Sequence, residues 1–138
     1  MSIVRVLAIV VALSCLASVG RAFSADWPMW RQGLERNGVS TDPLPSDLHP
    51  HWTRELSTPK PAWPNEPRLH FDASYEPVAV GQQLFVGSMV DGSLSAFDVE
   101  TGDLEWRFYS DGPVRLAPAV ADGRVYFGSD DGLLSCLE

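Results

Sequence analysis

Three histidines are the residues whose type best suits metal binding: His49, His51 and His70. The stretch His49-Pro50-His51 has the spacing at which two ligands could project from one extended strand. No cysteine lies nearby, and the carboxylates of Asp47 and Asp72 do not stand at a spacing used by zinc or other transition-metal sites. We therefore expect surface or turn histidines and no metal site.

Acidic residues are the second group with ligand chemistry. They are scattered over expected turns and strand ends, among them Asp91, Asp111, Asp122, Asp130 and Asp131. Such scatter is typical of a solvated rim. A cation site built from Asp91, or from Asp130 and Asp131, is the alternative interpretation.

Catalytic motifs are missing from the sequence. It contains no Gly-x-Ser-x-Gly, no His-Glu-x-x-His and no glycine-rich loop that could cradle a phosphate. We expect neither catalysis nor a bound cofactor, so the chain is predicted not to be an enzyme.

Residues 1–25 are predicted to be a signal peptide. Arg5 precedes an apolar run from Val6 to Val19, and small residues follow it. The run is short for a membrane span. Cleavage after Ala22 and cleavage after Ser24 fit equally well, and an uncleaved anchor is the alternative.

The chain has two cysteines. Cys15 lies inside the apolar run, in a context that fits a lipoprotein cleavage site poorly. Removal of the signal peptide would leave Cys136 as the single thiol, so no internal disulfide is expected. Its place in the repeat described below predicts a buried strand residue.

The charge of the chain restricts its partners. The formal net charge is −8, and it becomes −10 beyond residue 25 because only two of the ten basic residues precede that point. Phosphate binding needs clustered Lys and Arg, so nucleic acid and anionic lipid surfaces are disfavoured as partners. The balance suits an exported soluble domain, periplasmic or extracellular, with no membrane insertion after signal cleavage.

Two strands joined by a tight turn are predicted over residues 93–109. Ser93 to Asp98 and Leu104 to Tyr109 are rich in apolar and aromatic residues. Asp98, Thr101 and Gly102 favour reversal of the backbone between them. The two strands therefore form a hairpin.

The hairpin belongs to a repeat with a period of about forty residues. Residues 77–88 align with residues 118–129, and after a gap residues 91–98 align with residues 131–138. Within the first unit we expect strands over 78–80, 83–88, 93–98 and 104–109. Four short antiparallel strands per unit are typical of a β-propeller blade, so the fold class is predicted to be all-β.

A five-residue motif runs through the hairpin: Ala96, Asp98, Thr101, Gly102 and Trp106. It resembles the tryptophan-docking motif of the PQQ-like, or quinoprotein-like, β-propeller repeat. The resemblance implies that the Trp lies flat between neighbouring blades, on the Ala of its own motif and on the Gly-containing peptide of the next. We expect these residues to be structural, because the indole buries a large apolar area and Ala and Gly leave room for it.

The segment before the repeat, residues 26–76, has no period of its own. Its opening, residues 26–40, resembles the stretch that precedes the first blade in PQQ-like propellers. Residues 52–56 are expected to form an isolated outer strand that closes the ring by joining its last blade. The proline-rich stretch 57–76 either lines the mouth of a funnel at one end of the ring or is a loop packed down by its own aromatic residues.

The predicted organisation is thus a signal peptide (1–25), an N-terminal segment (26–76), a complete blade (77–117) and a partial blade (118–138). This amounts to about one and a half to two blades, an incomplete propeller. We expect an exported non-catalytic scaffold for protein–protein interaction, the N-terminal part of a longer PQQ-like repeat protein that resembles the outer-membrane protein assembly factor class. Unidentified protein partners and self-association through open blade edges are expected. The alternative is the N-terminal part of a PQQ-dependent dehydrogenase.

Overall fold

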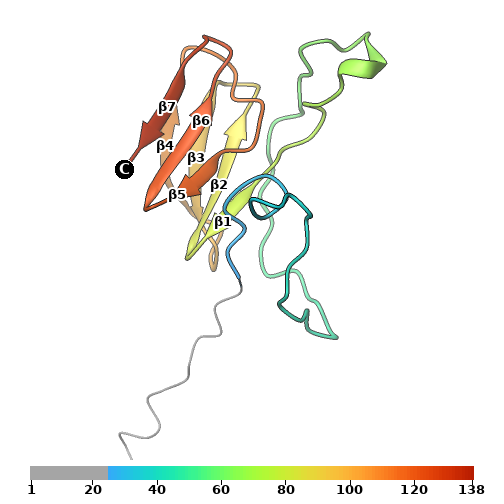
Figure 1. Cartoon of the computed structure of the whole chain (residues 1–138), viewed down its shortest axis with the longest axis vertical. Coiled ribbons are helices and arrows are strands. Elements are labelled where there is room, and N and C mark those ends of the chain that lie inside the picture. Colours follow the sequence, from blue (N-terminus) through green and yellow to red (C-terminus); the bar gives the residue numbers. More distant parts are fainter. Residues whose placement is uncertain (1–24) are drawn as a thin grey trace, which may run out of the picture.

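The computed structural model describes residues 25–138, so the predicted signal peptide lies outside the described residues except for Ala25. The described chain is all-β apart from one short 3₁₀ helix, η1. Its strands form two antiparallel sheets, of four and three strands (Figure 1). The all-β fold class, with sheets that correspond to propeller blades, is therefore confirmed. The strands are β1 (Val78–Val80), β2 (Gln83–Ser88), β3 (Ser93–Asp98), β4 (Leu104–Tyr109), β5 (Ala119–Ala121), β6 (Arg124–Gly128) and β7 (Leu134–Leu137).

The first sheet is a meander in the order β1-β2-β3-β4. Its strands have the bounds expected from the sequence. Glycines with positive φ make the turns: Gly81 lies between β1 and β2, and Gly92 between β2 and β3. A Cβ on Gly92 would lie 2.9 Å from the carbonyl oxygen of Gly112, so this turn and the loop after β4 approach each other too closely for any side chain.

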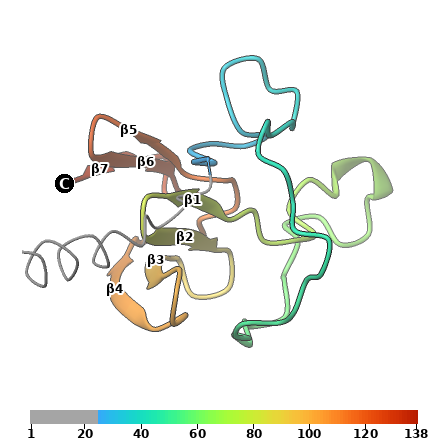
Figure 2. The ribbon, with the colours of Figure 1, turned by 90° about the horizontal axis from the view of Figure 1, so that it is seen from below.

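The second sheet, in the order β5-β6-β7, stacks on the first as a second layer (Figure 2). The core between the two layers contains Val78, Phe85, Leu94 and Ala96 from the first sheet, Val125 and Phe127 from the second, and Val114 from the connecting loop. Successive side chains of a strand point to opposite faces. Alternate residues of β2 and β3 therefore supply this core, and the residues between them face the other way.

The N-terminal segment is hydrogen-bonded to the first strand of each sheet. The backbone of Trp27 exchanges two hydrogen bonds with Ala79, and the carbonyl of Pro28 accepts one from the N–H of Val120. The Asp26 carboxylate accepts a further bond from the N–H of Gly81, at 2.8 Å. The Asp-Trp-Pro stretch thus links the two sheets at β1 and β5.

Residues 52–56 are not a strand within the described chain, contrary to the sequence prediction. Within residues 25–138, their backbone pairs with no strand. Trp52 packs instead on the first sheet. Whether residues 52–56 close a ring stays a prediction.

Residues 57–76 are irregular, as expected, except for η1 (Pro67–Leu69). This segment lies at the end of the sheets where the loops 89–92, 110–118 and 129–133 gather (Figure 1). Backbone hydrogen bonds join these loops, from Val114 to Ser88 and from Asp130 to Pro113. We call this end of the molecule the loop end.

Cys136 lies in β7, as expected, but it is exposed rather than buried. Its repeat counterpart, Ala96, is fully buried because the second sheet covers it. The face of the second sheet that carries Cys136 has no comparable cover within residues 25–138.

Candidate functional site

The turn between β3 and β4, residues 98–103, is built by the motif residues themselves. The Asp98 carboxylate accepts a hydrogen bond from the N–H of Thr101 at 2.7 Å, and the Asp98 carbonyl accepts one from Gly102. The Thr101 hydroxyl accepts a bond from the N–H of Asp103. Gly102 has a φ of +70°, which a residue without Cβ adopts readily. We call residues 98–103 the docking turn.

The docking turn carries the indole of Trp52. A Cβ on Gly102 would lie 2.6 Å from Cδ2 of this ring, so the ring rests directly on the glycine backbone. The Trp52 Nε1 donates a hydrogen bond of 2.7 Å to the carbonyl of Val99. The Arg54 side chain donates to the Gly102 carbonyl and forms an ion pair of 2.7 Å with Asp103. The indole that packs on Gly102 is therefore that of Trp52, a residue that the sequence analysis placed only in an outer strand.

Trp106 lies on the opposite side of the same hairpin, between the two sheets. It stands directly across from Ala96 in the β3–β4 register, and its ring centroid is 5.9 Å from that of Phe85. It packs on the core formed by both sheets. Asp98, Thr101 and Gly102 thus form the turn on which the Trp52 indole packs. Ala96 and Trp106 lie opposite each other in β3 and β4.

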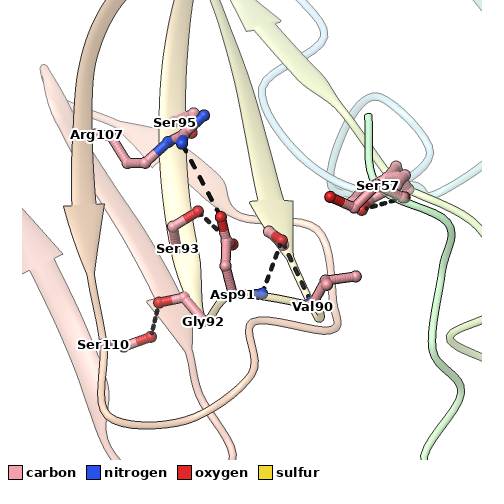
Figure 3. Close-up of polar contacts among 10 residues, drawn as sticks. Ser57, Val90, Asp91, Gly92, Ser93, Ser95, Arg107 and Ser110 are labelled. Atoms are coloured by element: carbon pink, nitrogen blue, oxygen red, sulfur yellow. Dashed lines mark hydrogen bonds and ion pairs between the residues drawn. The ribbon is translucent and has the colours of Figure 1, made fainter. Parts of the chain in front are cut away.

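A polar cluster lies on the face of the first sheet that points away from the second (Figure 3). The Ser93 hydroxyl donates to the Asp91 carboxylate at 2.8 Å, and the Arg107 Nε donates to the Ser95 hydroxyl at 2.8 Å. Ser93 and Ser95 are almost fully buried. Although burial raises the pKa of Asp91, the hydroxyls of Ser88 and Ser93 and the charge of Arg107 lower it, and the net shift is downward.

The carboxylates considered for a cation site are bound to protein groups. Asp130 pairs with Arg115 at 2.7 Å, and Asp131 accepts hydrogen bonds from the Ser129 hydroxyl and the Leu133 N–H. His49 lies 3.2 Å from the exposed Asp47. Among residues 25–138, no three His, Cys, Asp or Glu side chains are grouped so that they could hold a metal ion.

A second constellation, which the sequence analysis did not identify, lies at the loop end. The Arg115 guanidinium donates to Asp72 at 2.6 Å, to Asp130 at 2.7 Å and to the carbonyl of Lys60 at 2.9 Å. Asp72 has no exposed surface and also accepts a hydrogen bond from the N–H of Ala62. Arg115 therefore ties the irregular segment 57–76 to the loop that follows β6.

The electrostatics of this constellation favour its charged form. Burial raises the pKa of Asp72, but the N–H of Ala62 and the guanidinium of Arg115 outweigh that effect, and the pKa lies below its usual value of 3.8. The pKa of Arg115 is raised, because its hydrogen bonds to Asp130 and Asp72 outweigh the cost of burial. One oxygen of Asp72, Oδ1, is buried without a hydrogen-bond partner among the described residues.

An open pocket of about 550 Å³ lies beside Arg115, and we call it the aromatic pocket. The rings of Trp63 and Phe71 pack against each other, with centroids 5.8 Å apart, and form part of its wall. Each ring is about half exposed, and Leu116 is 59% exposed. The remaining lining residues are Ala62, Arg115, Gly128, Ser129 and Asp130. The interpretation of residues 57–76 as a loop packed by its own aromatic residues agrees with the contact between Trp63 and Phe71. Whether the stretch lines the mouth of a funnel in a ring stays a prediction.

Sequence signals point to the aromatic wall of this pocket but not to the ion pair beside it. Trp63 and Phe71 are among the aromatic residues of the proline-rich stretch 57–76, which the sequence marks as more apolar than an ordinary linker. Asp72 and Arg115 carry no such signal, because they are 43 residues apart and become partners only through the fold. Nothing in local spacing distinguishes Asp72 from the exposed acids.

The family described as outer membrane protein assembly factor BamB matches residues 18–138. The match covers both sheets, the docking turn and the aromatic pocket. No curated protein matches the chain. No helix among residues 25–138 is long and apolar enough to cross a membrane.

Proposed function

Because the chain belongs to the family of the outer membrane protein assembly factor BamB, we propose that it is an exported, non-catalytic propeller scaffold that binds a protein partner at its loop end. The description of the family names an assembly factor of the outer membrane, which supports both export and a role in protein association. The dehydrogenase alternative gains no support from an arrangement of residues within 25–138.

The aromatic pocket is the observation that carries this proposal. Exposed apolar side chains gathered at one place mark interaction surfaces more often than isolated ones do. Here Trp63, Phe71 and Leu116 surround a hollow of about 550 Å³. Aromatic residues that bury a large area at low entropic cost commonly dominate the binding energy of protein interfaces.

An ion-pair network of Arg115, Asp72 and Asp130 lies beside the pocket and holds its walls in place. The Arg115 side chain is only 14% exposed and is held by two carboxylates and one carbonyl. This anchoring positions residues 62–63 and 71–72 against the loop that carries Leu116 before any partner binds. Preorganisation of this kind lowers the entropic cost of binding.

Site-specific photo-cross-linking in cells tests the proposal. A photoreactive amino acid at position 63 or 71 should cross-link to one distinct protein, whereas the same residue at position 30 should not. Trp30 is the matched control, because it is a tryptophan of similar exposure, 47%, outside the pocket. The same cross-linked products at positions 30, 63 and 71, or none at position 63 or 71, would contradict a binding site here.

Binding by the purified partner then tests the pocket chemistry. The substitution Leu116→Asp should weaken binding at least about tenfold, since it places a charge in an apolar contact. Leu44→Asp, at an exposed leucine in the N-terminal segment, should leave binding unchanged. Equal affinities of the two variants would move the binding site elsewhere.

A further inference from the structure

The aromatic pocket has two kinds of wall. Trp63 and Phe71 supply aromatic rings, inclined at 54° to each other, and Leu116 supplies an aliphatic surface. Asp130 forms another part of the lining, and its side chain is 46% exposed although one carboxylate oxygen accepts a hydrogen bond from Arg115. The pocket therefore offers aromatic rings, apolar surface and an accessible negative charge to the same occupant.

The positive charge of Arg115 is already neutralised. Its Nη1 donates to Asp72 and to the carbonyl of Lys60, and its Nε donates to Asp130. One guanidinium thus faces two carboxylates, so the network of Arg115, Asp72 and Asp130 has a formal net charge of −1. An anionic occupant would have to compete with both carboxylates for Arg115, and Asp130 would repel it.

The loop end as a whole is acidic. Segment 57–76 and the loops 89–92, 110–118 and 129–133 contain seven carboxylate side chains and three basic ones, Lys60, Arg68 and Arg115. With His70 neutral, their formal net charge is −4. Complementary charges steer partners toward each other and exclude partners of the wrong sign. The charge of the loop end therefore favours a partner that presents basic groups.

Arginine and lysine side chains match this combination of groups. Each carries a cation on an aliphatic stem, which can pack on apolar surface while its charged end stays accessible. A cation above an aromatic ring is attracted by the π electrons of the ring. A carboxylate beside the ring adds a charge-assisted hydrogen bond. An uncharged apolar side chain could use the rings and Leu116 but not Asp130.

We propose that the aromatic pocket takes an arginine or lysine side chain of the protein partner, an inference that rests on the proposed function. The aliphatic stem of this side chain packs on Leu116. Its charged group lies between the rings of Trp63 and Phe71 and the carboxylate of Asp130. The partner is thus selected by charge as well as by apolar contact, and its binding weakens as the salt concentration rises.

Blocked tripeptides test this preference on the purified chain without the partner. The probe is acetyl-Gly-Arg-Gly-amide, and the matched control carries citrulline, which has the shape of arginine without its charge. Indole N–H signals of isotope-labelled tryptophan report binding, and the signal that is lost in Trp63→Phe identifies Trp63. We expect the arginine peptide to shift the Trp63 signal saturably and to bind at least about threefold more tightly than the citrulline peptide. The signal of Trp30, outside the pocket, should stay in place.

A charge-neutralising pair of variants tests the role of Asp130. Asp130→Asn should weaken binding of the arginine peptide about threefold and leave the citrulline peptide unaffected. Asp122→Asn removes the same charge at the exposed turn between β5 and β6, so it should leave both affinities unchanged. Asp130→Asn also removes a partner of Arg115. If this variant alters the Trp63 signal before any peptide is added, the comparison of the two peptides on the wild type decides the question.

Three results would overturn the proposal: no saturable shift of the Trp63 signal, equal affinities for the arginine and citrulline peptides, or equal effects of Asp130→Asn and Asp122→Asn. These results are distinguishable from a failure of the proposed function. Cross-links at position 63 or 71 without a preference for the arginine peptide would leave the scaffold proposal intact and overturn the basic occupant. A preference for the arginine peptide without cross-links at either position would overturn the binding of a protein partner at this pocket.

Discussion

The Trp52 ring lies on the backbone of Gly102, so close that a Cβ at position 102 would be 2.6 Å from the indole Cδ2. The two residues are far apart in sequence, and their contact links the irregular N-terminal segment to the first sheet at the docking turn. The Nε1–Val99 hydrogen bond fixes the orientation of the ring. The contact therefore combines apolar burial with one directional bond.

The substitution Gly102→Ala should displace Trp52 and lower the free energy of unfolding by about 2–3 kcal/mol, because it adds a steric clash to the cost of about 1–2 kcal/mol for positive φ. Gly81→Ala is the matched control, since Gly81 also has positive φ (+60°) but a Cβ at this position would meet no atom within 4 Å. Urea unfolding of both variants provides the measurement. Equal losses in the two variants would mean that the indole does not restrict position 102.

Export should follow from the first 25 residues. When the chain is produced in a Gram-negative host, we expect the periplasmic fraction to contain a shortened form that begins at Phe23 or Ala25, because cleavage after Ala22 or Ser24 fits the small-residue preference. N-terminal sequencing of the purified protein identifies the site. Replacement of Leu13 by Arg should retain the full-length chain in the cytoplasm, since a charge interrupts the apolar run. An unprocessed wild-type chain in the cytoplasm would contradict export.

The strands were predictable from the sequence because they depend on the types of residues that are neighbours along the chain. Runs rich in apolar and aromatic residues, the Asp98 and Gly102 turn residues and the forty-residue repeat all indicate the same elements, and agreement between levels is what makes a pattern reliable. The bounds of β1 to β4 accordingly agree with expectation.

Contacts between distant segments could not be predicted in the same way. The composition of residues 52–56 that favours a strand is local, but strand pairing requires a neighbour, and none of the described strands pairs with them. The exposure of Cys136 has the same cause, because burial of a blade face depends on the next blade rather than on the strand itself. The Asp72–Arg115 pair depends on how an irregular loop folds back, for which no periodicity exists.

Two strand glycines at equivalent repeat positions should respond differently to a methyl group. At Gly87, a Cβ would lie 2.6 Å from Cγ1 of the buried Val114, whereas at Gly128 the nearest atom is the Leu133 carbonyl at 3.9 Å. We expect Gly87→Ala to lower the free energy of unfolding by about 1–3 kcal/mol through overpacking. Gly128→Ala should be neutral or slightly stabilising, because Ala reduces the entropy of the unfolded chain. Urea unfolding at low protein concentration compares the two variants. A larger loss of unfolding free energy for Gly128→Ala than for Gly87→Ala would contradict the close contact between position 87 and Val114.

The stability of the chain in acid should depend on Asp72. Its pKa is lower in the folded chain than the usual value of 3.8, so its charged form stabilises the fold above that value and the contribution disappears as the pH falls through the folded pKa. Asp72→Asn should lower the free energy of unfolding by about 3 kcal/mol near neutral pH, because Arg115 loses a buried partner.

Between about pH 6 and about pH 3, the Asp72→Asn variant should lose less stability than the wild type, since it lacks the carboxyl that takes up a proton on unfolding. The exposed Asp122→Asn is the control and should retain the wild-type pH dependence. Urea midpoints measured across this range distinguish the two variants. Parallel pH profiles for Asp72→Asn and the wild type would show that the pair with Arg115 does not shift the titration of Asp72, and the acid sensitivity would then have to come from carboxylates such as Asp91 and Asp131, whose pKa values are also lowered.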